Sequence, residues 1–396
     1  MTIAIYSALL FSFAILTFAR FTQSPLWMAT LTPLASIIGS GFLIIGPILG
    51  AEFGAAAPVA MMVLCVLAYL FGHAIRTNIA TAENAAPGSI IHRMDTVASW
   101  ALGLAYIISV TYYLNLFGAF FMDLLPYTNP YLPKGITSAV LVGLMILGWI
   151  QGFHALERLE KVTVTVKLAI ICALFVALSI WATQTLSSPP ILLTGDVDLG
   201  TPAQLFLIFG LLVTVQGFET SRYMGADYPA QTRIRAMRHA QIITGVIYIL
   251  YISLLVYFVP MPPTVTSETE IITIMAHVSG ALPLLLITGA LAAQFSAAVA
   301  DIAGGGGLFS QLTNGRLSAK GAYALIAGIG LVLTWQFDVF AIIGLASRAF
   351  AFYYAIQSGI AAWIAYKNRA RLGATGYTML AMLGACIVLF GASVEG

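Results

Sequence analysis

The sequence predicts an all-helical protein that crosses a membrane many times. Three observations support this fold class: 60% of the 396 residues are hydrophobic, only 8% are charged, and long apolar runs recur along the chain. Soluble domains carry about 25% charged residues, so this chain has too few to cover a water-exposed surface. Strand-like alternation is absent, which argues against a transmembrane barrel. We therefore expect a polytopic helical membrane protein.

About twelve segments have the length and composition of membrane-spanning helices. A helix needs about 20 mostly apolar residues to cross the hydrocarbon core. The first segment has no basic region before it and no convincing cleavage site after it, so we interpret it as a retained helix, not a signal peptide. The segments lie near 3–19, 27–49, 56–75, 97–125, 134–153, 162–183, 202–226, 239–260, 273–304, 321–336, 339–366 and 373–392.

The charged residues predict an orientation. If every segment spans, 14 of the 17 Lys and Arg residues lie on one side of the membrane. Loops of the opposite side carry acids instead, namely Asp196, Asp198, Glu268 and Glu270. Cytoplasmic loops are enriched in Lys and Arg. We therefore expect a multi-pass protein of the cell (inner) membrane, with both termini extracytoplasmic.

Two segments carry interruptions near their centres. The second segment contains Ile38-Gly39-Ser40-Gly41, and the seventh contains Val215-Gln216-Gly217-Phe218-Glu219. Paired discontinuous helices in corresponding positions indicate a transporter's binding site. Exposed N–H groups at one broken end favour an anion, and freed carbonyls at the other accept from an ammonium group. A small zwitterion fits both polarities, although glycines also let helices pack closely.

At these residues the sequence resembles the amino acid–polyamine–organocation (APC) superfamily of secondary transporters. The likeness rests on the run Ile37 to Gly41, on Gly217-Phe218-Glu219, and on the turn Asp227-Tyr228-Pro229 before a basic stretch. It implies a LeuT-like fold of two inverted five-helix repeats, at 27–183 and 202–367, which alternates access to a midplane substrate. A further helix precedes the core within 1–25, and another follows at 373–392. Backbone around Ile38, Gly39, Ser40 and Gly41 is then expected to receive the substrate carboxylate, and the stretch from Val215 to Glu219 its amino group.

Lys167 lies inside the sixth segment, where an ionisable group costs about 2.5–3.5 kcal/mol. Its side chain could extend to the cytoplasmic face, since Lys161 lies nearby. In some sodium-independent relatives, however, a Lys ammonium on the fifth core helix replaces a sodium ion, and Lys167 matches that position. The resemblance therefore implies that Lys167 bridges the broken first core helix and the eighth, through Ser296. Burial lowers the pKa of a lysine, so proton release during transport is also open.

Three other charges lie inside predicted segments. Arg348 is expected to form a structural salt bridge, an outer gate or a contact to an anionic substrate group, with Glu219 as one candidate counter-charge. Glu219 is expected to neutralise a substrate amine, to carry a proton, or to cap the restarted half-helix. Asp301 is expected to act as a gate or a cap toward the cytoplasmic end.

Aromatic and amide side chains complete the expected site. Tyr112 supplies an aromatic wall, Phe218 is a candidate for the occluding gate, and Gln216 is a candidate for a specificity contact, because a buried amide needs partners. Such aromatic residues also commonly serve packing alone.

These features favour a secondary transporter for a small amino acid or related amine, independent of sodium and either proton-coupled or an exchanger. Alternatives are a polyamine or organic-cation transporter and a transporter-like sensor. A membrane enzyme or a metal site needs a cluster of His, Asp or Cys at depth, and the five His and three Cys form no such motif. No clustered basic patch indicates nucleic acid. The run Gly304–Gly307 lacks a P-loop ending, so no cofactor is expected.

Overall fold

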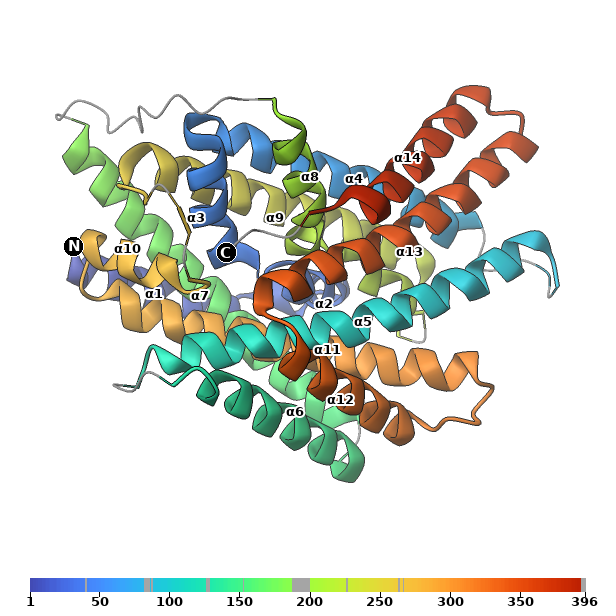
Figure 1. Ribbon diagram of the computed structural model, residues 1–396, viewed down its shortest axis with the longest axis horizontal. Coiled ribbons are helices and arrows are strands. Elements are labelled where there is room, and N and C mark those ends of the chain that lie inside the picture. The colour runs from blue at the N-terminus through green and yellow to red at the C-terminus, as the bar shows by residue number, and fades with distance from the viewer. Residues whose placement is uncertain are drawn as a thin grey trace.

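The computed structural model describes residues 1–396 apart from 40, 82–85, 87, 126–128, 152, 187–199, 226, 263, 266 and 393–396. Side chains 21, 151 and 153–161 also lie outside the description, although their backbone is placed. Every secondary-structure element among the described residues is a helix (Figure 1). The predicted all-α membrane fold is therefore confirmed.

The first half of the chain holds seven α-helices and two short 3₁₀ helices among its described residues. Helices α2 and α3 both lie in the second predicted segment, which is interrupted between them. In order the elements are α1 (Thr2–Phe18), η1 (Arg20–Gln23), α2 (Pro25–Ile37), α3 (Gly41–Phe53), η2 (Gly54–Ala56), α4 (Ala57–Thr81), α5 (Ile90–Met122), α6 (Leu132–Gln151) and α7 (Phe153–Thr185).

The second half begins with another interrupted segment, in which one α-helix is followed by two 3₁₀ helices. The elements are α8 (Pro202–Gly210), η3 (Leu212–Val215), η4 (Phe218–Tyr223), α9 (Ala230–Phe258), α10 (Glu270–Val278), α11 (Leu282–Leu312), α12 (Ala319–Gln336), α13 (Val339–Lys367) and α14 (Arg371–Phe390).

The predicted single segment at 273–304 is wrong, because it contains two helices. The short α10 ends at Val278, and Ser279 is extended, with φ −161° and ψ 135°. Proline then lies in the first turn of α11, where its missing N–H costs nothing. The spanning helix α11 therefore starts only at Leu282.

Eight stretches of the described chain are long and apolar enough to cross a membrane. Of the other predicted spans, the first corresponds to the shorter apolar helix α1. The rest correspond to the two interrupted segments and to α12. The eight stretches are Gly41–Thr81, Ile90–Met122, Leu132–Ile150, Val162–Thr185, Ala230–Phe258, Leu282–Leu312, Val339–Lys367 and Arg371–Phe390.

Local sequence fixes where several helices begin. Five helices are each preceded by a residue whose side chain accepts a hydrogen bond from a backbone N–H in the first turn. These residues are Ser24, Ser89, Thr201, Ser318 and Asp338. Such caps satisfy donors that the helix itself leaves unpaired. Thr201 forms a full capping box with Gln204. The starts of these helices are therefore encoded close to the helices themselves.

The long helix α5 lies in the middle of the bundle and packs against both α11 and α13 (Figure 1). Glycines permit the close approach of their neighbours. A Cβ at Gly306 of α11 would overlap the ring of Tyr323 on α12, and a Cβ at Gly103 of α5 would come within 2.8 Å of the Phe309 ring. Small residues are the usual means of tight helix packing in lipid. The glycine run of α11 therefore has a packing role.

Candidate functional site at the two broken helices

The first break separates α2 from α3. Helix α2 ends at Ile37, Ile38 takes the non-helical values φ −80° and ψ 55°, and α3 starts at Gly41. Ser40, which the sequence places in this site, lies outside the described residues. The expected interruption of the second segment is therefore present, and it exposes the amino end of α3 within the bundle.

The second break follows α8. After Gly210 the chain forms the 3₁₀ turn η3, Gln216 is extended with ψ 173°, and Gly217 has φ +115° before η4 begins. A positive φ of this size is open to glycine and costly for other residues. Gly217 is thus the residue that lets the chain turn at this point.

The two breaks lie directly against one another. A Cβ at Gly217 would come within 2.5 Å of Ser36 Oγ and 2.7 Å of the Ile37 nitrogen. A Cβ at Gly41 would overlap the backbone and side chain of Thr214, which immediately precedes Val215. Glycine at both positions is therefore required by contact between the breaks, as well as by backbone conformation at Gly217.

Side chains from other helices pair with the carbonyls that the breaks set free. Tyr248 of α9 donates its hydroxyl to the carbonyls of Ile37 (3.1 Å) and Thr214 (2.8 Å), which joins the two breaks. Ser347 of α13 donates to the Gly210 carbonyl at 2.6 Å and accepts from the Val213 N–H at 2.9 Å. Buried backbone groups must find such partners in lipid.

Lys167 provides the other long-range partner of the first break. Its ammonium donates to the Ala35 carbonyl at 2.6 Å and to Ser296 Oγ at 3.3 Å, and its side chain is only 2% exposed. Lys167 thereby links α7 to α2 and α11, and it does not reach toward the membrane surface. The contact that the sequence predicts with Ser296 is present.

Glu219 lies at the start of η4 and is fully buried. Its Oε2 accepts from the Gly217 N–H at 3.0 Å and from the Tyr354 hydroxyl of α13 at 2.7 Å. Phe218 stacks on the Tyr354 ring with centroids 5.1 Å apart. The carboxylate therefore holds the turn at Gly217 and is itself held by α13.

Several buried acceptor atoms around the second break have no hydrogen-bond partner within the described structure. They are Glu219 Oε1, Gln216 Oε1 and Ser36 Oγ. Gln216 donates its amide to the Tyr113 hydroxyl, and the Tyr112 ring packs 5.4 Å from that of Tyr113. Tyr112 and Gln216 thus lie in one buried polar cluster, from α5 and the second break.

Arg348 and Asp301 both have hydrogen-bond partners that the sequence does not indicate. The pairing of Arg348 with Glu219 is wrong: the exposed Arg348 donates to the Gly391 carbonyl from Nε (3.0 Å) and a terminal nitrogen (2.7 Å). It therefore holds the end of α14, because the folded chain brings that carbonyl to α13. The buried Asp301 accepts a hydrogen bond from Ser109 of α5.

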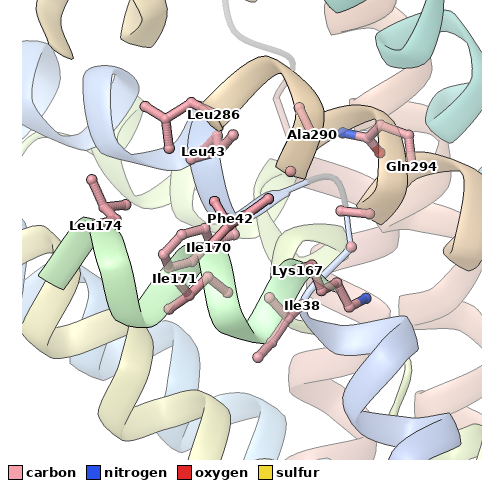
Figure 2. A pocket seen from close by; sticks show the side chains of 13 residues that line it. Ile38, Phe42, Leu43, Lys167, Ile170, Ile171, Leu174, Leu286, Ala290 and Gln294 are labelled. Carbon is pink, nitrogen blue, oxygen red and sulfur yellow. The ribbon is translucent and has the colours of Figure 1, made fainter. Parts of the chain in front are cut away.

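A small pocket adjoins the first break, between α3, α7 and α11 (Figure 2). Ile38 and Gly39 of the break form part of its wall, together with Lys167. Figure 2 shows Lys167 and Gln294 near one end, with Leu174 and Leu286 toward the other. A largely apolar hollow thus lies beside the first break.

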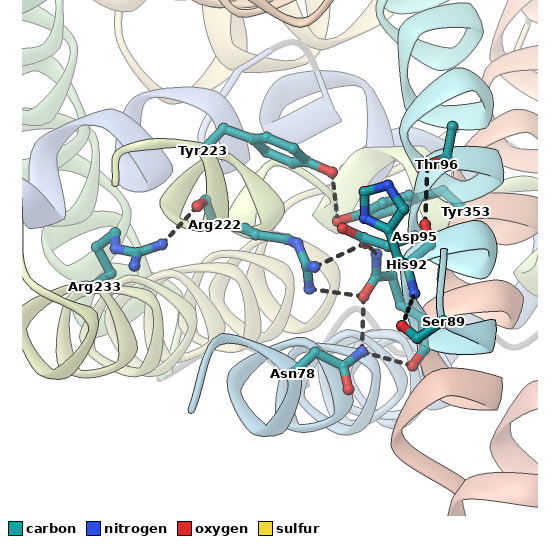
Figure 3. Close-up of polar contacts among 10 residues, drawn as sticks. Asn78, Ser89, His92, Asp95, Thr96, Arg222, Tyr223, Arg233 and Tyr353 are labelled. Carbon is teal, nitrogen blue, oxygen red and sulfur yellow. Dashed lines mark hydrogen bonds and ion pairs between the residues drawn. The ribbon is translucent and has the colours of Figure 1, made fainter. Parts of the chain in front are cut away.

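A buried polar network lies beyond the second break (Figure 3). Arg222, from the end of η4, forms an ion pair with Asp95 of α5 at 2.8 Å and donates to Gln357 of α13 at 2.9 Å. Gln357 also contacts Asp95 at 3.2 Å, and Asn78 of α4 donates to the Gln357 side chain at 2.7 Å. The network therefore ties η4 to three helices.

The sequence patterns do not predict this network. A signal was available, because Gln357 is an amide within a predicted span and Asn78 closely follows one, and buried amides need partners. Their partners were not predictable, since Asn78 and Gln357 are separated by 279 positions and Arg222 and Asp95 by 127.

The comparisons with known proteins agree with this architecture. A family model described as "APC superfamily transporter" matches residues 19–391, and the chain therefore belongs to the APC superfamily. An uncharacterised protein of Aquifex aeolicus (strain VF5) is 39% identical over 378 residues, covering 93% of this chain and 92% of that protein.

Two solved structures share the fold. MhsT in complex with L-phenylalanine matches with a TM-score of 0.63 and 16% identity, covering 93% of this chain and 99% of that one. Mhp1, a nucleobase-cation-symport-1 family transporter with bound bromovinylhydantoin, matches with a TM-score of 0.53 and 16% identity, covering 93% and 92%. The fold is thus the LeuT fold, and both family and fold are those of multi-pass membrane transporters.

Proposed function

We propose that the protein is a secondary active transporter that moves a small amino acid or related amine by alternating access, without sodium. In this proposal the two five-helix repeats, at 27–183 and 202–367, each contribute one broken helix to the site. The observation that carries it is a group of buried acceptors around the second break that have no partner among the described residues: Glu219 Oε1, Gln216 Oε1 and, from α2, Ser36 Oγ.

These acceptors suit an ammonium group. A buried polar atom without a partner costs about 1–3 kcal/mol, so three of them form a site that gains from a donor-rich ligand. An ammonium group carries three donors and no acceptor. Glu219 adds a carboxylate to balance its charge.

The amino end of α3 suits a carboxylate. The first N–H groups of a helix have no partner within it, and the helix dipole places positive potential there. Gly41 opens α3 beside Thr214 of the other break, so this end lies next to the proposed ammonium site. One small zwitterion can span the two.

Lys167 takes the place of a coupling cation in this proposal. Its ammonium group is buried and joins the carboxyl end of α2 to α11, through Ala35 and Ser296. A fixed positive charge there removes the need for a bound cation to hold these helices together. Protons or a counter-substrate then supply the driving force, and the basic-rich ends of the helices face the cytoplasm.

Uptake into proteoliposomes tests the proposal. Labelled glycine, alanine and valine are offered with and without sodium, and with and without an inward proton gradient. We expect uptake that persists when choline replaces sodium. Uptake that collapses without sodium contradicts the role of Lys167.

A transporter of organic cations is the second candidate, because Glu219 is a buried carboxylate with one oxygen that has no partner in the described part of the chain. Comparing alanine with ethylamine separates the two candidates. A preference for ethylamine favours the cation carrier. Counterflow of labelled substrate distinguishes a carrier from a sensor, which binds its ligand without exchanging it across the membrane.

A further inference from the structure

The pocket beside the first break differs in character from the polar cluster at the second. Its walls are mostly aliphatic, with Ile170 and Ile171 from α7, Leu286 and Ala290 from α11, and Leu43 from α3; the Phe42 ring, Lys167 and Gln294 also line it. Ile38 and Gly39 of the first break line it, so it adjoins the place where the proposed substrate carboxylate lies. An apolar wall of this kind matches an apolar part of a ligand.

One polar atom in the lining lacks a partner. Gln294 is 1% exposed, and its Oε1 has no hydrogen-bond partner within the described structure. Gln294 lies one turn of α11 from Ala290 and two residues before Ser296, the partner of Lys167. A buried amide oxygen left in this state is ready to accept a hydrogen bond from a ligand at the mouth of the pocket.

We infer that this pocket receives the side chain of the substrate, that the side chain is a small aliphatic one, and that Gln294 accepts a hydrogen bond from the substrate amine. The inference rests on the proposed function and names its substrate class: neutral amino acids, or amines, with short branched or unbranched aliphatic chains. Charged side chains are excluded, because the far end of the pocket offers them no polar partner.

The size of the pocket sets the upper limit. The pocket has a volume of about 20 Å³, just above what one water molecule requires. A methyl group therefore fits as the walls stand, a branched side chain of three carbon atoms requires them to move slightly, and an aromatic ring requires a larger movement. We expect valine and alanine to bind more tightly than phenylalanine.

Two opposite changes of pocket size test the inference. Ala290→Leu fills the pocket, and Leu286→Ala enlarges it, in the full-length purified protein. Dissociation constants are measured by calorimetry for glycine, valine and phenylalanine. One methylene group in an apolar pocket changes specificity by about 10–200-fold. We expect Ala290→Leu to weaken the binding of valine at least tenfold relative to that of glycine. We expect Leu286→Ala to strengthen the binding of phenylalanine at least tenfold relative to that of valine.

Matched variants complete the design. Ala292→Leu adds the same bulk on α11 at a half-buried position outside the lining, and it should leave the glycine-to-valine ratio unchanged. Gln294→Met keeps the side-chain length and removes the acceptor, so it should weaken all three ligands about tenfold.

The outcomes separate the inference from the proposed function. If the unmodified protein binds no amino acid or amine, the proposed function and this inference both fall. If it binds them and the two pocket variants shift glycine, valine and phenylalanine equally, the inference alone is overturned. Tighter binding of phenylalanine than of valine by the unmodified protein also overturns it.

Discussion

The ion pair between Arg222 and Asp95 is expected to hold the basic-rich end of the transport pathway closed. Arg222 belongs to the second broken segment, whereas Asp95, Gln357 and Asn78 belong to α5, α13 and α4. Opening this end moves η4 away from those helices and must therefore break these contacts. The substitution Asp95→Asn removes the charge and keeps the side-chain shape. It should therefore destabilise the closed state specifically.

The burial of the pair sets the size of the effect. The Arg222 side chain is 4% exposed, and that of Asp95 is 34% exposed. Removing one partner of a fully buried pair costs about 3–5 kcal/mol, and exposed pairs contribute less than about 1 kcal/mol. An intermediate value of about 2 kcal/mol corresponds to about a thirtyfold shift toward the open state.

Thiol labelling measures this shift. Ser221 precedes Arg222 and is fully buried, so Ser221→Cys reports opening in a protein whose three native cysteines are replaced by serine or alanine. We expect a water-soluble maleimide to react at least tenfold faster after Asp95→Asn. Arg222→Gln should act similarly, and the double variant should fall short of the sum, as contacting residues do.

Asp227→Asn is the matched control, because Asp227 lies exposed near the same end of the bundle. It should leave the labelling rate unchanged. A rate after Asp95→Asn within twofold of the unmodified rate, or fully additive effects in the double variant, refutes the closing role of the pair.

Three further predictions concern other parts of the molecule. Lys167→Met should abolish uptake and lower stability by about 1–3 kcal/mol in thermal unfolding, because the Ala35 carbonyl loses its donor. An uptake rate within twofold of that of the unmodified protein contradicts this. Lys134→Met, at an exposed site, is the control. Gly217→Ala should lower the free energy of unfolding by about 2–4 kcal/mol, since it adds a steric clash to the strain of a positive φ. Gly315 has φ +77° and open space around it, so Gly315→Ala measures the backbone strain alone. Equal losses of stability in the two variants refute the clash. Burial raises the pKa of Glu268, so its ionisation costs stability as the pH rises through that pKa. Glu268→Gln should therefore raise the melting temperature at pH 8, with the gain vanishing toward pH 4; a gain that grows on acidification contradicts the sign.

Much of the fold follows from local sequence. Apolar length predicted the spans, because each must cover the same hydrocarbon thickness. Glycines predicted both interruptions, because Gly217 must adopt a positive φ and Gly41 must let another backbone approach. The boundary of α11 was missed because the apolar run continues through Ser279, and hydropathy does not detect a single extended residue.

The candidate site was predictable in part. The contact between Lys167 and Ser296 was predictable because an ammonium group within a span needs a buried partner. The family resemblance indicated which helix holds that partner. The partner of Arg348 was not predictable, because a backbone carbonyl such as that of Gly391 carries no mark in the sequence.

The sequence alone determined the environment, the number of apolar segments and the two places where the helix cannot continue, since each depends on residues close together in the chain. The tertiary structure decided which atoms meet: Tyr248 across both breaks, Arg222 against Asp95, and the aliphatic hollow ending at Gln294. Such contacts join residues far apart in the chain, and they depend on how whole helices are rotated and stacked. Hydropathy fixes that a helix lies in the membrane, but packing fixes which face meets which neighbour.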